Sequence, residues 1–141
     1  LFKDNGIKYI NKILLAILPQ KDNSKFIEAT SMITDFYNND SDGIEANFTV
    51  LHIIPTDTEN SEINEIKFRT EKILKKHPQG DLSLIKHNNP EKYISEISAE
   101  YDLLIIGTPK HNDWASILFG TGKDKFVENA TCSVLRLTIK N

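Results

Sequence analysis

The sequence is poor in cysteine, and it has neither a long apolar run nor an excess of basic residues. Cys132 is the only cysteine among 141 residues, which excludes an internal disulfide and a cysteine-cluster metal site and is compatible with a reducing compartment. The longest apolar run, Ile13 to Leu18, is far too short to cross a bilayer. The net charge is −3, whereas a nucleic-acid-binding domain usually presents a basic face, so we expect no nucleic-acid partner.

The sequence also lacks the groupings that metal sites and catalytic centres need. Its four histidines are scattered, without the close spacing of a structural metal site. His52 stands inside an expected strand, so we expect it to be a hydrogen-bonded residue of the core or of a pocket edge. Cys132 begins another expected strand, with no histidine close to it in sequence, and buried cysteines are usually inert. The sequence therefore predicts no metal site and no catalytic residue.

The composition that is present is that of a globular domain. Hydrophobic residues make up 39% of the chain and charged residues 26%, which is ordinary for a soluble protein. We expect one domain over residues 12–141, because this length is enough to bury a core. Residues 1–11 lack a clear period and are expected to form a linker or a docked arm. The start at Leu1 rather than at methionine fits a segment of a longer polypeptide, and we expect a cytoplasmic location.

Apolar runs alternate regularly with amphipathic stretches along the chain. Expected strands span 12–18, 46–54, 82–86, 102–106 and 132–139, and expected helices span 22–38, 61–77, a stretch that begins at Asn89-Pro90, and 123–130. This alternation predicts an α/β fold: a single, doubly wound, five-stranded parallel sheet with helices on both faces and right-handed crossovers.

Two of these elements carry a further expectation. In the helix 22–38, Phe26, Ala29, Ile33 and Phe36 recur at helical spacing, which predicts an apolar face turned to the sheet. The strand 82–86 alternates enough in polarity to lie near an edge of the sheet.

Ligands of an open, doubly wound sheet bind at the carboxyl ends of the strands, where the strand order reverses. Here we expect the reversal between the first and the fourth strand. A glycine at the end of a buried strand and a Gly-Thr-Gly at a helix start both expose backbone N–H groups, which suit an anion such as phosphate. The expected ligand-binding residues are Leu18, Ile53, Gly107, Thr108, Lys110, Gly120, Thr121 and Gly122.

Two parts of this expected site have alternative interpretations. Gly120-Thr121-Gly122 either holds phosphate groups through its N–H groups and the Thr121 hydroxyl, or forms an ordinary helix start with Thr121 as N-cap. Lys110 either screens phosphate charge or fills the site and excludes the ligand.

The same residues resemble those of the universal stress proteins. The signature of that family is glycine, two residues, glycine, nine residues, and glycine followed by serine or threonine; this chain has Gly107, Lys110 and Gly120-Thr121 at that spacing. Thr131-Cys-Ser-Val-Leu-Arg-Leu resembles the family's last strand, and Val50-Leu-His-Ile-Ile-Pro55 its second strand. The resemblance implies an adenine-nucleotide α-hydrolase-like fold, in which the order of the five parallel strands is 3-2-1-4-5. It also implies a non-enzymatic regulatory domain of the stress response that binds ATP or AMP.

Two positions depart from the family pattern. Nucleotide-binding members usually carry an aspartate after the first strand, where this chain has Leu18, and Lys110 replaces the middle glycine. One alternative is therefore a dimerisation or scaffold domain that has lost nucleotide binding. The other is an enzyme, at most a weak ATP hydrolase.

The resemblance also implies partners. Related domains dimerise through the last strand, so we expect a homodimer through Ser133 to Ile139, with Arg136 and Thr138 on the more polar side of the interface. Because apolar strand edges need protection, pairing with a second copy would provide it. Similar domains are attached to membrane transporters, so this chain is a candidate for the cytosolic tail of a transporter.

Overall fold

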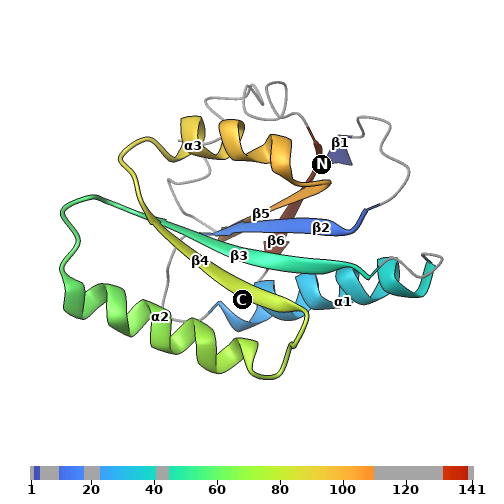
Figure 1. Cartoon of the computed structure of the whole chain (residues 1–141), viewed down its shortest axis with the longest axis horizontal. Coiled ribbons are helices and arrows are strands. Elements are labelled where there is room, and N and C mark those ends of the chain that lie inside the picture. Colours follow the sequence, from blue (N-terminus) through green and yellow to red (C-terminus); the bar gives the residue numbers. More distant parts are fainter. Residues whose placement is uncertain (1, 4–9, 18–22, 41–44, 110–131, 140–141) are drawn as a thin grey trace.

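The computed structural model describes residues 2–3, 10–17, 23–40, 45–109 and 132–139. These residues form one six-stranded sheet, three α-helices and a short 3-10 helix (Figure 1). The strands are β1 (Phe2–Lys3), β2 (Lys12–Ile17), β3 (Asn47–Ile54), β4 (Gly80–Lys86), β5 (Leu103–Pro109) and β6 (Ser133–Ile139). The helices are α1 (Ser24–Asp40), α2 (Asn60–Leu74), α3 (Pro90–Ile97) and the 3-10 helix η1 (Ser98–Glu100).

The order of the strands across the sheet is β1-β6-β5-β2-β3-β4. Every neighbouring pair from β4 to β6 is parallel, so the predicted parallel sheet of order 3-2-1-4-5 is confirmed. The sequence did not predict β1, which pairs antiparallel with β6 through Phe2↔Leu135 and Lys3↔Val134. Phe2 and Lys3 therefore lie against the outer side of β6.

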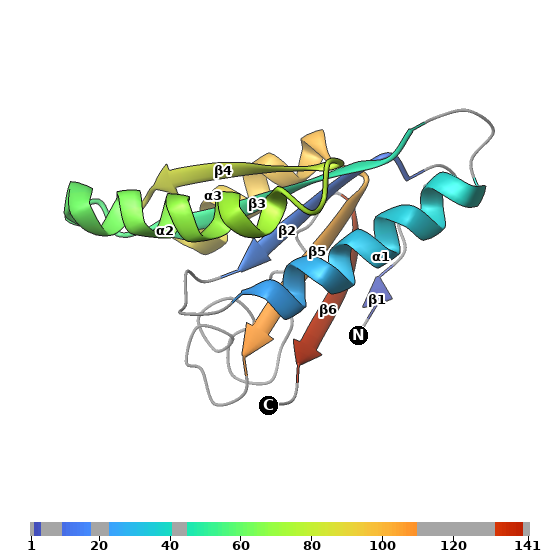
Figure 2. The same ribbon diagram turned by 90° about the horizontal axis from the view of Figure 1, so that it is seen from below.

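Helices cover both faces of the sheet (Figure 2). On one face, α1 and α2 enclose a cluster that includes Ile13, Leu15 and Phe48; on the other, Ile94 of α3 packs on a cluster that includes Leu14 and Leu104. Alternate residues of β2 thus enter opposite clusters. This explains why the strand is an unbroken apolar run rather than an alternating one.

The buried face of α1 differs from the expected one. Phe26 and Ile27 are buried, but Phe36 is 64% exposed, and the face turned to the sheet continues through Thr30 and Thr34 instead. Each threonine hydroxyl donates to the backbone carbonyl four residues earlier, at 2.8 Å in both cases. Because these bonds satisfy the hydroxyls, Thr30 and Thr34 can be buried against the sheet, although a pattern of apolar residues does not predict them there.

The predicted start of α3 is confirmed. The side chain of Asn89 accepts a hydrogen bond from the backbone N–H of Lys92 at 3.1 Å, and Pro90 is the first helical residue. In the part of the chain that the structure describes, no helix is both long and apolar enough to cross a membrane.

Candidate functional site

The strand order reverses between β2 and β5, as the sequence predicts. From β2 the chain crosses to β3 and then to β4 on one side, and returns to β5 on the other side of β2. The pairing of β5 with β2 ends at Ala16↔Ile106, whereas its pairing with β6 continues to Pro109↔Ile139. Within the described residues, the end of β5 therefore projects beyond its pairing with β2. A topological switch point of this kind is where open α/β sheets bind ligands.

Three of the expected site residues lie among the described residues, and all are at the carboxyl ends of strands. The backbone of Gly107 and Thr108 pairs with Leu137 and Thr138 of β6. Ile53, near the end of β3, is 6% exposed and belongs to the core cluster on the α3 face. The other expected residues, Leu18, Lys110, Gly120, Thr121 and Gly122, lie outside the described residues, as does the expected helix 123–130.

The first turn of α1 lies beside the same strand ends (Figure 2). The backbone N–H groups of a first helical turn have no partner within the helix, and they carry partial positive charge that favours an anion. Asn23 immediately precedes this turn, and its carbonyl accepts the N–H of Ile27 at 3.1 Å. Its side chain is 5% exposed, and Oδ1 has no hydrogen-bond partner in the described structure.

A buried acceptor without a partner is uncommon in folded proteins. Asn23 was not among the residues expected at the site. The signal that could have found it is its position: a residue with a short polar side chain directly before a helix that begins at the switch point.

His52 contacts the last residue of β2, Ile17, close to the switch point. This agrees with the prediction that His52 is a hydrogen-bonded residue of the core or of a pocket edge. The ring is fully buried, with Nδ1 at 3.3 Å from the carbonyl oxygen of Ile17 and Nε2 at 3.1 Å from Oγ1 of Thr70. Since a carbonyl can only accept, we assign the proton to Nδ1; Nε2 then accepts from the Thr70 hydroxyl. The neutral imidazole thus connects α2 to the last residue of β2.

The surroundings of His52 keep it neutral. Burial lowers its pKa from 6.5 to about 4; the hydrogen bond to Ile17 acts in the opposite direction, and the positive charge of Arg69 lowers the pKa further. The contact of Thr70 with His52 was not predicted. Thr70 stands four residues from both Ile66 and Leu74, so its place on the buried face of α2 could have been recognised from helical spacing.

Polar residues fix the loops at the same end of β3 and β4. The Oδ1 atom of Asn88 accepts the backbone N–H of Thr56 at 3.2 Å and its hydroxyl at 3.1 Å. The ring of His87 lies 5.5 Å from that of Tyr93. Burial, followed by the nearby Tyr101 and Glu100, raises the pKa of Tyr93 above its ordinary value.

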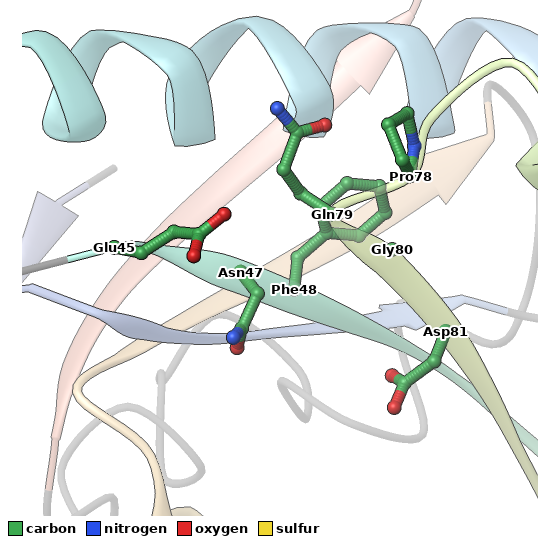
Figure 3. Close-up of a pocket in the computed structure, with 7 residues that line it drawn as sticks. All are labelled: Glu45, Asn47, Phe48, Pro78, Gln79, Gly80 and Asp81. Carbon is green, nitrogen blue, oxygen red and sulfur yellow. The ribbon is translucent and has the colours of Figure 1, made fainter.

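A hollow of about 280 Å³ lies at the opposite end of the sheet (Figure 3). It is formed around the amino ends of β3 and β4, where Asp81 and Glu45 contribute carboxylates. Its lining residues are Glu45, Asn47, Phe48, Pro78, Gln79, Gly80 and Asp81. Two carboxylates without a basic side chain repel phosphate, so this hollow does not suit a nucleotide.

The described residues contain no group of three or more histidine, cysteine, aspartate or glutamate side chains that could hold a metal ion. Within them, the switch point brings together the first turn of α1, the backbone of Gly107 and Thr108 near the end of β5, and an apolar core.

Comparisons with known proteins find similarity in fold but not in sequence. No protein-family model matches the sequence, and no curated protein matches it. Among solved structures, 17 chains match. One is a universal stress protein in complex with cAMP; it aligns with a TM-score of 0.66 and 13% sequence identity, over 94% of this chain and 100% of that one. The chain therefore has the fold of the universal stress proteins.

Proposed function

We propose that this domain is a non-enzymatic regulatory module that binds an adenine nucleotide at the carboxyl ends of β2 and β5. The observation that carries the proposal is the reversal of strand order between these strands, with Gly107 and Thr108 at the projecting end of β5. A solved structure of the same fold holds cAMP, which supports the nucleotide class of the ligand.

Two features of the described residues support a nucleotide as the ligand. The first turn of α1 supplies N–H donors and positive potential for phosphate groups. The unpartnered Oδ1 of Asn23 supplies an acceptor, which matches a ribose hydroxyl or the amino group of adenine. In this proposal, Gly107, Thr108, Lys110, Gly120, Thr121 and Gly122 contact the phosphates, while Leu18 and Ile53 flank the base or the ribose.

The regulatory part of the proposal concerns an attached protein, for which a membrane transporter is the candidate. A nucleotide shifts a conformational equilibrium only by the difference between its affinities for the two states. We therefore propose that nucleotide binding changes how the domain contacts the attached protein, with no chemical step on the nucleotide.

A scaffold domain without a ligand is the second candidate. It is favoured by Leu18, which stands where nucleotide-binding relatives of this fold usually carry an aspartate, and by Lys110 in place of a glycine. The two functions make opposite predictions for nucleotide binding, so one set of titrations separates them.

The test is calorimetric titration of the wild-type chain and three variants with AMP, ATP and cyclic AMP. Leu18→Asp restores the carboxylate and should tighten binding. Thr121→Ala removes a hydrogen bond to a charged group and should weaken binding about tenfold or more. Thr49→Ala, at the other end of the sheet, is the matched control and should leave the affinity unchanged.

The outcome for Leu18→Asp is the most informative. A site that only attracts negative charge would bind more weakly after a carboxylate is added, whereas an adenosine site of this fold would bind more tightly. Wild-type protein that gives no heat at millimolar nucleotide supports the scaffold function instead.

A further inference from the structure

The outer edge of β4 is unpaired among the described strands. At the other side of the sheet, β1 lies against β6 at Val134 and Leu135, whereas β4 has a neighbouring strand, β3, on one side only (Figure 1). An edge strand presents a row of backbone N–H and C=O groups that can pair with another strand.

The hydrogen bonds at both ends of β4 show which residues face that edge. The carbonyl of Gln79 accepts the N–H of Phe48 at 3.0 Å, and the N–H of His87 donates to the carbonyl of Ile54 at 2.9 Å. In a parallel ladder, alternate residues direct both backbone groups toward the same neighbour. The odd-numbered residues of β4 therefore bond to β3, and Leu82 and Leu84 direct their N–H and C=O groups outward.

The centre of this edge lacks the features that normally prevent pairing. Proteins protect edge strands with charged side chains, proline or bulges. In β4 the charged residues Asp81 and Lys86 are exposed and stand at the ends, while the four residues between them, Leu-Ser-Leu-Ile, are uncharged and half-buried. The register of β4 with β3 runs without a bulge from Gly80 to Lys86.

We propose that β4 pairs with β4 of a second copy of this chain, antiparallel and centred on Ser83. A two-fold axis between the strands and perpendicular to the sheet keeps each side chain on its own face, so directly opposed residues have numbers of the same parity. Centred on Ser83, Leu82 lies opposite Leu84 of the second copy, and each of these leucines both donates to and accepts from its partner.

The sequence of β4 matches itself in this register. The facing leucines form an apolar cross-strand group on the face that α2 covers, because Leu82 packs against that core cluster. Asp81 lies opposite Ile85, so no like charges oppose each other directly. A register centred on Leu84 would instead place Lys86 opposite Leu82 and break the apolar group. This proposal does not rest on nucleotide binding, and the interface is a different one from the expected dimer contact through β6.

Disulfide formation at the two-fold axis tests the proposal. Ser83 opposes its own copy in a non-hydrogen-bonded pair, in which the Cα atoms are about 4.5 Å apart, within the range that a disulfide spans. The full-length Ser83→Cys variant should therefore form a covalent dimer under mild oxidation. Asp81→Cys is the matched control, on the same face of the same strand but distant from its own copy in this register. The native Cys132 is buried, so wild-type protein should not cross-link.

A second pair of variants covers the case in which the cysteine variant does not fold. Leu84→Lys adds a charge inside the proposed interface, and Ile63→Lys adds the same charge to a half-buried residue of α2. Sedimentation should find a dimer for wild type and Ile63→Lys and a monomer for Leu84→Lys, with all three folded by circular dichroism. Wild-type protein that is monomeric at its highest soluble concentration overturns the proposal. A dimer that Leu84→Lys leaves intact also overturns it, as does equal cross-linking through positions 81 and 83.

Discussion

The buried imidazole of His52 should make the stability of this domain depend on pH between about pH 4 and pH 6.5. Its pKa is lowered from 6.5 to about 4 in the folded state. Between these values the unfolded chain binds a proton that the folded chain does not, so the free energy of unfolding falls as the pH falls. His52 therefore stabilises the fold fully above about pH 6.5, and its contribution is lost progressively down to about pH 4.

The size of the effect follows from the difference between the two pKa values. At 1.36 kcal/mol for each pKa unit, the limit is about 3 kcal/mol, and about 2 kcal/mol of it is lost between about pH 7 and about pH 5. That loss is a large part of the total stability of a domain of this size.

Urea denaturation of the wild type and of His52→Gln measures this contribution. Other histidines and the carboxylates titrate in both proteins, so the difference between their pH dependences isolates His52. The wild type should lose about 2 kcal/mol more than the variant over this range, whatever the stability of the variant at neutral pH. Equal pH dependences would refute the account of a neutral imidazole held between Ile17 and Thr70.

Three further predictions concern residues that fix the ends of the strands and helices. Gly80→Ala should destabilise the domain by about 1–3 kcal/mol, because a Cβ atom there would stand 2.7 Å from Cε2 of Phe48 and 2.9 Å from Cδ2 of Leu74. A variant as stable as wild type in urea would show that the ring of Phe48 can move aside without cost. Asp102→Ala should cost about 1–3 kcal/mol, because Oδ2 accepts the N–H groups of Asn11 at 3.1 Å and Lys12 at 3.0 Å. Thermal unfolding checks this value, and Glu100→Ala, an exposed acidic residue close by in sequence, should leave the melting temperature unchanged. Asn89→Ala should cost about 1 kcal/mol through the lost cap of α3, with Asn89→Ser restoring most of it; if alanine and serine behave alike in urea, the cap does not stabilise the helix.

The sheet could be predicted because its central strands are recognisable in the sequence. β2 and β3 are apolar runs covered on both faces, and their alternation with helices restricts the topology to a doubly wound sheet. β1 could not be predicted, because its two residues show no period and depend on contacts with a strand more than a hundred residues away.

The errors on α1 have a different cause. Apolar periodicity assigned Phe36 to the buried face, but the hydroxyls of Thr30 and Thr34 are satisfied within the helix, and these residues face the sheet instead. Met32, 73% exposed, lies on the outer side with Phe36. Hydrogen bonds that a side chain makes to its own helix are invisible to a pattern of hydrophobicity.

The sequence predicted the place where the strand order reverses, but it did not predict the polar contacts around that place. The carboxyl ends of β2 and β5 follow from strand order alone, and Gly107 and Thr108 lie there. The Thr70 partner of His52 and the unpartnered oxygen of Asn23 depend on which helix face meets the sheet, which the sequence leaves open. The binding roles of Ile53, Gly107 and Thr108 stay predictions. So do those of Leu18, Lys110 and Gly120 to Gly122, which lie outside the described part of the chain.

Amide chemical shifts recorded during a titration with AMP test the location of the proposed nucleotide site most directly. Saturable changes should cluster at the end of β2, the first turn of α1 and Gly107 and Thr108 of β5, while the amides of Asn47 and Asp81 at the other end of the sheet stay unchanged. A spectrum that AMP leaves unaltered, or changes that gather around the hollow of Glu45 and Asp81, would contradict the proposed location.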